Sequence, residues 1–74
     1  MANDFKAMEK NQGGLCKICQ QPEKEGTRLC VDHDHKTGRI RGLLCRRCNR
    51  TLGLAKDDVS VLFAMVQYLE RNRI

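Results

Sequence analysis

The stretch CVDHDHKTGRIRGLLCRRCN, from Cys30 to Asn49, decides the fold because it joins metal-binding side chains to a hairpin pattern. Residues 28 to 33 and 39 to 44 have the composition of strands, and Thr37 with Gly38 supplies turn residues between them. A short helix is expected over 49 to 54, with Gly53 closing it. The sequence therefore predicts a β-hairpin followed by a helix, in a small α+β fold.

Two pairs of cysteines enclose this hairpin, Cys16 with Cys19 and Cys45 with Cys48. Their two-residue spacing suits tetrahedral zinc. A disulfide framework is the alternative, but it usually has an even number of cysteines and a signal sequence, whereas this chain has 5 cysteines and no apolar segment over residues 1 to 12. We expect a reducing compartment and four thiolates on zinc, with Cys30 as a buried strand residue.

Zinc is expected to stabilise the fold rather than perform chemistry. A chain of 74 residues buries too little surface for a robust apolar core, and its apolar residues gather after position 52. Four thiolates also leave the ion no open position for water or substrate. The zinc of this domain is therefore predicted to be structural.

Helices are expected at both ends of a single domain that covers residues 1 to 74. The first, over 3 to 11, has Asn3 or Asp4 as its cap and lies in an N-terminal segment of residues 1 to 13. The zinc-bound core covers 14 to 54 and includes a polar connector at 20 to 27. The last helix lies within 57 to 72, with Asp57 or Asp58 as its cap.

The last helix carries a broad apolar arc. Helical spacing assigns its buried face to Val59, Leu62, Phe63, Val66 and Leu69, and further apolar residues widen that face. The N-terminal helix could cover it; a second copy of the chain, in a homodimer, is the other candidate. No run of residues approaches the length of a membrane span, so we expect a cytoplasmic protein without membrane contact.

Positive charge is concentrated around the hairpin. The net charge is +5, and no acid interrupts residues 36 to 50. Such a run is either a solvated face or a phosphate-binding surface, and a neighbouring metal cluster favours the second. The candidate nucleic-acid contacts are Lys36, Arg39, Arg41, Arg46, Arg47 and Arg50.

Asp32, His33, Asp34 and His35 are not needed by the zinc, which already has four ligands. Phosphodiester hydrolysis needs a base, a divalent cation and phosphate contacts. An imidazole at position 33 suits the base, and oxygen atoms of Asp32 and Asn49 suit Mg²⁺ or Mn²⁺. Neighbouring strand residues face opposite ways, so Asp32 and His33 can share a site only where the chain departs from ideal strand geometry.

The segment LCVDHDHKTGRIRGLLCRRCNRTLG, together with the upstream CKIC, resembles the recombination endonuclease VII family of phage nucleases. That family belongs to the His-Me finger group, also described as ββα-metal or HNH-like. The resemblance covers Cys16 to Gly53, about half the chain. It implies a zinc-stapled ββα-metal core in which a hairpin and a helix clasp one catalytic metal.

The resemblance also implies roles for individual residues. Asp32 and Asn49 would bind catalytic Mg²⁺, His33 would activate water, and His35 would lie beside the scissile phosphate. Asp34 has no role from the resemblance and is expected to stabilise the turn or to form hydrogen bonds. Some relatives carry a carboxylate three residues after the asparagine, where this chain has Leu52.

The function expected from the sequence is a metal-dependent DNA endonuclease that nicks one strand and leaves 5′ phosphates. One chain offers one site, which is sufficient for a nick. The alternatives are a non-catalytic zinc module that binds nucleic acid and a zinc module that binds protein through the last helix. A phage origin, and with it the cytoplasm of a host cell, is implied by the resemblance alone.

Overall fold

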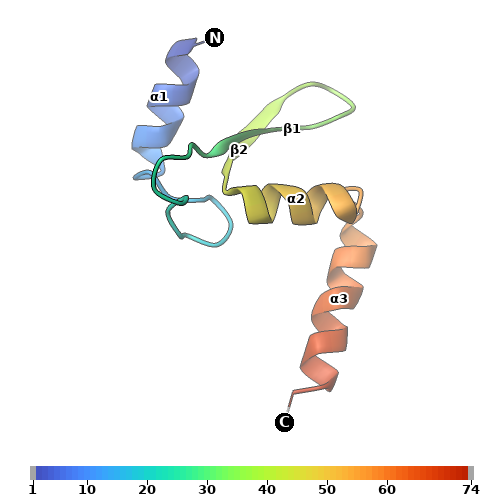
Figure 1. Ribbon diagram of the computed structural model, residues 1–74. Coiled ribbons are helices and arrows are strands. Elements are labelled where there is room, and N and C mark those ends of the chain that lie inside the picture. Colours follow the sequence, from blue (N-terminus) through green and yellow to red (C-terminus); the bar gives the residue numbers. More distant parts are fainter. Residues whose placement is uncertain (1, 74) are drawn as a thin grey trace.

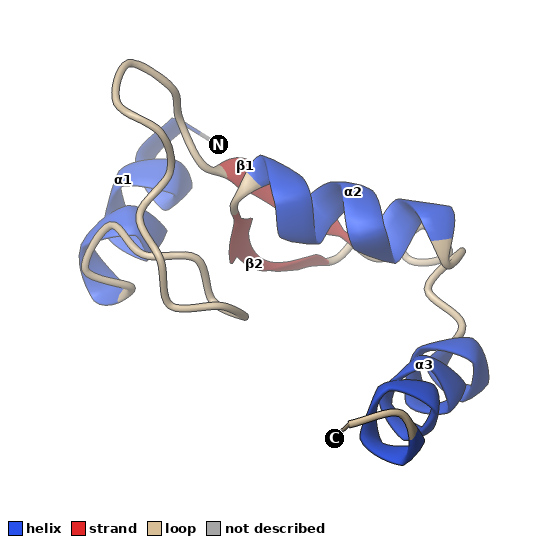
Figure 2. Cartoon of the chain, turned by 60° about the horizontal axis from the view of Figure 1, so that its bottom comes forward, coloured by secondary structure: helices blue, strands red, loops and turns tan. Residues whose placement is uncertain are grey.

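A computed structural model describes residues 2 to 73 and arranges them as a small α+β fold (Figure 1). The elements follow the order α1, β1, β2, α2 and α3, with bounds Ala2–Asn11, Cys30–His33, Ile40–Leu44, Arg46–Leu54 and Val59–Arg71. The two strands form one antiparallel sheet. Figure 2 shows α2 running alongside this hairpin, while α1 and α3 lie at opposite ends of the molecule. The predicted hairpin and the following helix are confirmed.

The hairpin contains an irregularity near its turn. Asp32 pairs with Gly42, but the next residue of β1, His33, pairs with Ile40. Arg41 is therefore an extra residue on β2, and the register shifts between Asp32 and His33. Such a bulge redirects side chains. The extra residue lies on β2, opposite Asp32 and His33, whereas the prediction required β1 itself to depart from ideal strand geometry at this point.

The turn that joins the strands depends on Asp34. Its carboxylate accepts hydrogen bonds from the backbone N–H groups of Lys36 at 2.8 Å and Thr37 at 3.2 Å. These donors, with smaller effects from nearby cations, lower the pKa of Asp34. Gly38 completes the turn with φ +77°, a conformation that favours glycine. The turn-stabilising role expected for Asp34 is confirmed.

The core is small and includes the zinc-type cysteines. Leu43 and Cys16 are fully buried, and Leu29, Leu44 and Cys45 join them. Side chains from α1, the cysteine loop that follows it, β1 and α2 pack around this cluster, namely Phe5, Met8, Cys19, Val31, Cys48 and Leu52. The apolar core and the candidate metal centre are therefore one structure.

Helix α1 packs against β2 and ends as predicted at the start of the cysteine loop. Its first residue is Ala2, ahead of the expected cap at Asn3 or Asp4, whose side chains lie outside the part described. Gly13 and Gly14 follow with φ +64° and +74°, so the chain turns sharply after the helix. Phe5 also lies under the Arg28 guanidinium, 4.3 Å from ring centre to Cζ.

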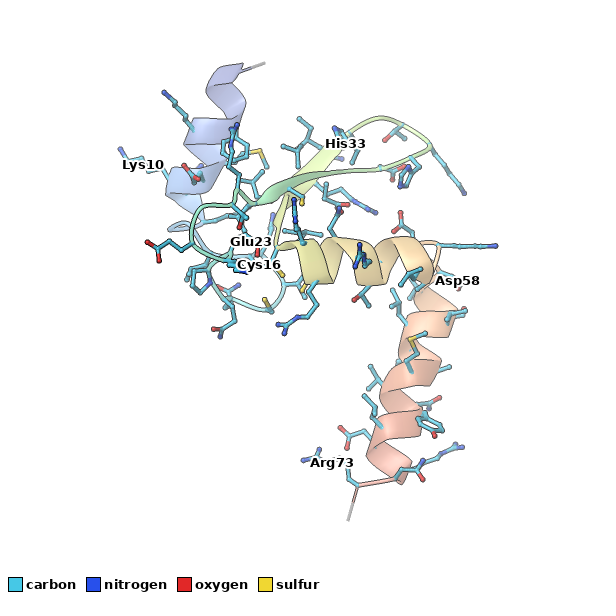
Figure 3. All side chains as sticks on the ribbon, in the orientation of Figure 1. Lys10, Cys16, Glu23, His33, Asp58 and Arg73 are labelled. Atoms are coloured by element: carbon cyan, nitrogen blue, oxygen red, sulfur yellow. The ribbon has the colours of Figure 1, made fainter. Side chains whose placement is uncertain are left out.

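Helix α2 begins three residues earlier than the sequence indicated. Cys45 is its cap, and the Arg46 N–H donates to the Glu23 carboxylate at 2.7 Å, which satisfies a free amide of the first turn. Figure 3 labels Glu23 beside this helix start. Helix α2 ends at Leu54 as predicted, but the expectation that Gly53 closes it is wrong, since Ala55 forms its C-cap.

Helix α3 has the predicted length, but its apolar face is not covered. Asp58 caps it by accepting from the N–H groups of Ser60 and Val61 at 2.9 and 3.3 Å. Most of the predicted buried face is exposed, at 60% for Phe63 and 65% for Leu69, while Leu62 is half buried, and α1 packs on the hairpin instead. Lys56 and Asp57 both have left-handed backbones, and α3 extends away from the hairpin beyond them (Figure 1). The expectation of a cover by the N-terminal helix is therefore wrong.

Candidate metal centre and polar cavity

The four paired cysteines come together as the sequence predicted. The Sγ atoms of Cys16, Cys19, Cys45 and Cys48 all lie within 4.8 Å of one another. The Cys19 and Cys45 sulfurs are 3.8 Å apart, close to the edge of about 3.8 Å that a tetrahedron with Zn–S bonds of roughly 2.3 Å requires. All five cysteines are free thiols. This geometry fits a closed zinc site.

Backbone amides support two of the sulfur atoms. The Ile18 N–H donates to Cys16 Sγ at 3.4 Å, and the Cys48 N–H donates to Cys45 Sγ at 3.4 Å. Each cysteine pair thus bends so that an amide two or three residues further on faces the first sulfur. Such bonds stabilise thiolates, which are the form that binds metal.

Two of these thiols have opposed pKa shifts. Burial raises the pKa of Cys16, but hydrogen bonds with the backbone of Cys45, Cys19 and Ile18 outweigh it and bring the pKa to about 6. Burial and hydrogen bonding with the other thiols raise the pKa of Cys48 to about 12. Four thiolates packed this closely repel one another unless a cation lies among them.

Arg47 lies beside the thiol cluster. Its hydrogen bond with Cys19, together with the charges of Cys19, Cys45 and Cys48, raises the pKa of the guanidinium. A zinc ion with four thiolates carries net negative charge, so a neighbouring arginine offsets part of it. Arg47 is therefore placed where it would offset part of that charge.

Cys30 stands apart from this cluster. It lies at the start of β1, is only half buried, and lines a cavity beside α2 rather than the cysteine cluster. The expectation of a buried Cys30 is met only in part, because the strand begins at this residue.

A polar cavity of about 530 Å³ lies between the hairpin and α2. The predicted residues Asp32, His33, His35 and Asn49 all line it. Leu52, which stands where some relatives carry a carboxylate, lines it too. The sequence-predicted catalytic residues are thus gathered at one place, from β1, the turn and α2.

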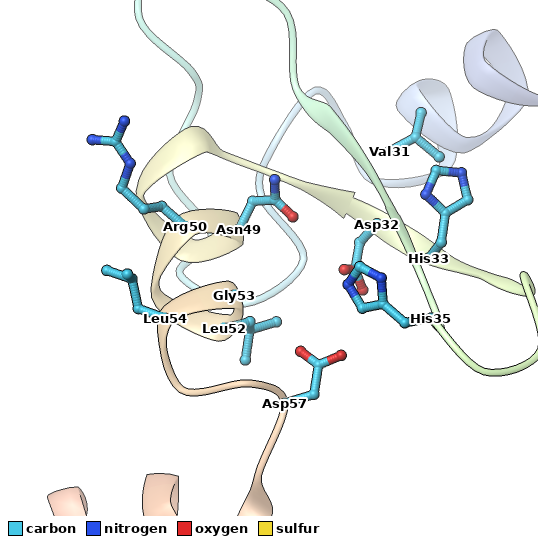
Figure 4. A pocket seen from close by; sticks show the side chains of 10 residues that line it. All are labelled: Val31, Asp32, His33, His35, Asn49, Arg50, Leu52, Gly53, Leu54 and Asp57. Carbon is cyan, nitrogen blue, oxygen red and sulfur yellow. The ribbon is translucent and has the colours of Figure 1, made fainter.

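The side chains enter this cavity from different directions. In Figure 4, His33 extends on the same side of the strand as Val31, whereas Asp32 and His35 extend towards Asp57. Asn49 projects from α2 towards the hairpin. Strand β1 ends at His33, so His35 belongs to the turn. The alternation of side chains along a strand therefore does not determine the direction of His35.

Asp32 is the most shielded polar side chain of the cavity, with 11% of its side chain exposed. Arg41 binds it through both oxygens, Nε to Oδ2 at 2.6 Å and Nη2 to Oδ1 at 2.9 Å. The same Nη2 also donates to Asp57 Oδ2 at 3.3 Å. The hydrogen bond to Asp32 is the main cause that raises the pKa of Arg41. Of the candidate nucleic-acid contacts, Arg41 therefore faces inward to carboxylates.

Asp57 is a residue of this cavity that the sequence interpretation missed. We expected Asp57 or Asp58 to cap α3, and Asp58 alone does so. Asp57 instead points its carboxylate towards His35 and Asp32 (Figure 4). Two adjacent acids before one helix were the available signal, because a single side chain is sufficient for the cap.

A second cavity, of about 730 Å³, adjoins the first along α2. The two share Asn49, Arg50 and Leu54. The second is lined further by Arg46 and Arg47, so three arginines of α2 border it. We call this the basic groove. Lys36 and Arg39 lie exposed in the hairpin turn, outside the groove.

Comparisons with known proteins find phage relatives of this chain. The chain is 46% identical over 71 residues to the Gene 59 protein of Mycobacterium phage D29, covering 95% of this chain and 43% of that protein. It is 52% identical over 59 residues to the Gene 59 protein of Mycobacterium phage L5, covering 78% of this chain and 36% of that protein. The chain thus spans less than half the length of these curated relatives.

No helix within residues 2 to 73 combines the length and apolar character needed to cross a bilayer. The profile of recombination endonuclease VII matches residues 1–71, which include every side chain of the cysteine cluster and the polar cavity. The chain belongs to the recombination endonuclease VII family.

Proposed function

We propose that this chain is a metal-dependent DNA endonuclease that hydrolyses a phosphodiester, nicks one strand and leaves a 5′ phosphate. The observation that carries the proposal is the convergence of Asp32, His33, His35 and Asn49 on one cavity in a chain of an endonuclease family. Zinc on the four cysteines would hold the hairpin and α2 together. The unit β1, β2 and α2 would then be the ββα-metal core of a His-Me finger, within one domain of residues 1 to 74.

The base in this proposal is His33. Its side chain is exposed at the cavity, so water and a DNA strand can both reach the imidazole. A neutral imidazole accepts the proton of the attacking water near neutral pH. His35, from the turn, would contact the scissile phosphate and keep it in line with that water.

The oxygen atoms of the cavity fit a hard divalent cation. Asp32 offers a shielded carboxylate and Asn49 a neutral amide oxygen, and Mg²⁺ or Mn²⁺ commonly takes only one or two such protein ligands and retains several waters. When bound, the cation would neutralise charge developing on the phosphate and on the departing 3′ oxygen. The protein's part is to hold those two oxygens from β1 and α2.

The DNA backbone would follow the basic groove into the polar cavity. Arg46, Arg47 and Arg50 border the groove, and Lys36 and Arg39 would add contacts from the hairpin turn. The net charge of +5 supports a polyanionic partner. No base-reading pattern is needed for this mode of binding, since the contacts are with phosphates.

We also propose that two copies associate through α3. Its apolar side chains border a surface groove of about 540 Å³ made by Val61, Ala64, Met65, Tyr68 and Leu69. Exposed apolar patches of this kind are typical of interaction sites. Since the relatives are phage proteins, we propose the host cytoplasm as the place of action.

A second candidate function is a zinc module that binds nucleic acid without cutting it. The ion pair of Arg41 with Asp32 favours it, because both carboxylate oxygens already have a partner. This module would bind DNA in a salt-dependent way and show no turnover.

Plasmid nicking separates the two candidates. Purified wild-type protein in Mg²⁺ should convert supercoiled plasmid to the nicked form, and His33→Ala should reduce the rate about 100-fold or more while DNA binding persists. Asp34→Asn is the matched control, since it removes a charge from the same motif but keeps the oxygen that accepts the turn hydrogen bonds. Equal rates for wild type and His33→Ala, at equal zinc content, would refute the proposal.

A further inference from the structure

The Arg41 guanidinium is held between two carboxylates of the polar cavity. Its Nη2 atom lies 2.9 Å from an oxygen of Asp32 and 3.3 Å from an oxygen of Asp57. A single nitrogen atom is thus within hydrogen-bonding distance of both acids, which come from β1 and from the segment before α3. One positive charge at this point satisfies both carboxylates.

This arrangement is partly shielded from solvent, most strongly at Asp32. The exposed fractions of the side chains are 11% for Asp32, 27% for Asp57 and 37% for Arg41. Two carboxylates in such surroundings repel each other unless a cation lies between them. Arg41 supplies that cation because the bulge leaves it as the extra residue of β2 and directs it to this side.

Asp57 reaches the cavity at a conformational cost. Its φ is +56° and that of Lys56 is +55°, in the left-handed region that residues with a side chain rarely adopt. Helix α3 does not require this conformation of Asp57 for its cap, which Asp58 provides. The consequence of the conformation is that the Asp57 carboxylate faces Arg41 and the polar cavity.

We infer that Asp57 is a further oxygen ligand of the divalent-cation site, and that Arg41 neutralises Asp32 and Asp57 until the cation displaces it. The inference rests on the proposed function, because it takes Asp32 as a ligand of that cation. Metal and guanidinium then compete for the same oxygens. The released guanidinium is free to bind a phosphate of the DNA, for which its planar pair of donors is well suited.

Metal binding by the zinc-loaded full chain tests both parts, with Mn²⁺ as the probe in calorimetry. Arg41→Gln should bind Mn²⁺ about tenfold more tightly than wild type or better, since it removes a competing charge-assisted hydrogen bond. Arg39→Gln is the matched control, because it removes the same charge from the neighbouring turn. Adding Asp57→Asn to Arg41→Gln should weaken Mn²⁺ binding about tenfold, in a background without the guanidinium.

Each outcome has a distinct meaning. If Arg41→Gln binds Mn²⁺ no more tightly than wild type, competition is refuted while the nuclease proposal stands. If Asp57→Asn does not weaken binding in the Arg41→Gln background, Asp57 is not a ligand. If neither wild type nor Arg41→Gln binds Mn²⁺ at retained zinc content, the proposed catalytic metal site itself is refuted.

An NMR measurement on wild type covers the case in which Arg41→Gln fails to fold. The Arg41 Nε–H resonance should move as Mg²⁺ is added and should saturate together with the Asp32 amide resonance, because one event releases the guanidinium and fills the site. Saturation of the Asp32 resonance with the Arg41 Nε–H unchanged would overturn the inference.

Discussion

The side chain of Gln12 pairs with both backbone groups of Leu43. Its Nε2 donates to the Leu43 carbonyl at 3.0 Å, and the Leu43 N–H donates to its Oε1 at 3.0 Å. The same Nε2 donates to the Leu15 carbonyl at 2.8 Å. The side chain of Gln12, just after α1, thus makes the hydrogen bonds to Leu43 that a neighbouring strand would make to β2. These bonds hold the helix and the start of the cysteine loop against the hairpin.

Replacing this glutamine should destabilise the domain. Gln12→Ala leaves the buried backbone of Leu43 without these partners, so we expect the free energy of unfolding to fall by about 1–3 kcal/mol. Urea unfolding of the zinc-loaded protein measures the change. Gln67→Ala, at an exposed position of α3, removes the same amide and should leave the midpoint unchanged. Equal midpoints for both variants would contradict the role of Gln12.

Removing zinc should unfold the core. In small zinc domains the binding free energy, about 10–16 kcal/mol in zinc-finger peptides, is also folding free energy. A variant with serine at all four clustered cysteines should therefore lose most of its far-UV circular dichroism from α2 and the hairpin. Cys30→Ser, outside the cluster, is the control and should fold and bind zinc normally. An unchanged spectrum for the four-serine variant would show that zinc is dispensable.

Asn49 should be required for cleavage more than for DNA binding. Asn49→Ala removes the neutral oxygen proposed to hold the cation, and we expect plasmid nicking in Mg²⁺ to slow about 100-fold. Asn49→Asp keeps an oxygen at the same place and should retain more activity than Asn49→Ala. Asn72→Ala, which removes an amide at the end of α3, should have no effect on nicking. Full activity in Asn49→Ala would remove this residue from the site.

Arg50 should contribute one phosphate contact. Since Arg50 borders both the basic groove and the polar cavity, Arg50→Ala should lower the slope of log K against log salt concentration by roughly 0.7–0.9. Fluorescence anisotropy with labelled DNA across salt concentrations measures it. Arg71→Ala, at the end of α3, is matched in charge and should leave the slope unaltered. The same slope for Arg50→Ala and wild type would place DNA elsewhere.

The exposed face of α3 should mediate self-association. Met65→Asp combined with Leu69→Asp places charges on groove side chains that are 49% and 65% exposed, so the fold should persist while the dimer is lost. Sedimentation over micromolar concentrations compares this variant with wild type. Gln67→Asp adds a charge to the same helix and serves as the control. A wild-type protein that is monomeric at every concentration would contradict the proposal.

Local patterns predicted most of the fold. The hairpin, the cysteine cluster and the cap of α3 by one of two acids follow from spacing and turn residues close in sequence. The start of α2 was misplaced because the Glu23 carboxylate that satisfies its first amide comes from a distant loop. The exposed face of α3 was misjudged because periodicity identifies an apolar face but not what covers it.

The candidate site was predictable only in part for a related reason. Asp32, His33, His35 and Asn49 form a recognisable motif, and the cavity gathers them. The position of Arg41 depends on a strand bulge, and that of Asp57 depends on two residues with left-handed backbones. The residue types at these positions do not specify either feature. The sequence therefore identifies the motif residues, and only the tertiary structure places Arg41 and Asp57 beside Asp32.

The position of the cysteine pairs also determines how the chain tolerates a backbone cut. With zinc bound, Cys16 and Cys19 are joined to Cys45 and Cys48, so the hairpin with Asp32, His33 and His35 lies inside a closed ring of chain and metal. A protease that cleaves the polar connector at 20 to 27 opens this ring without separating its pieces. The zinc would hold both fragments together until a chelator removes it. The cut would therefore separate the two fragments only after the metal is lost.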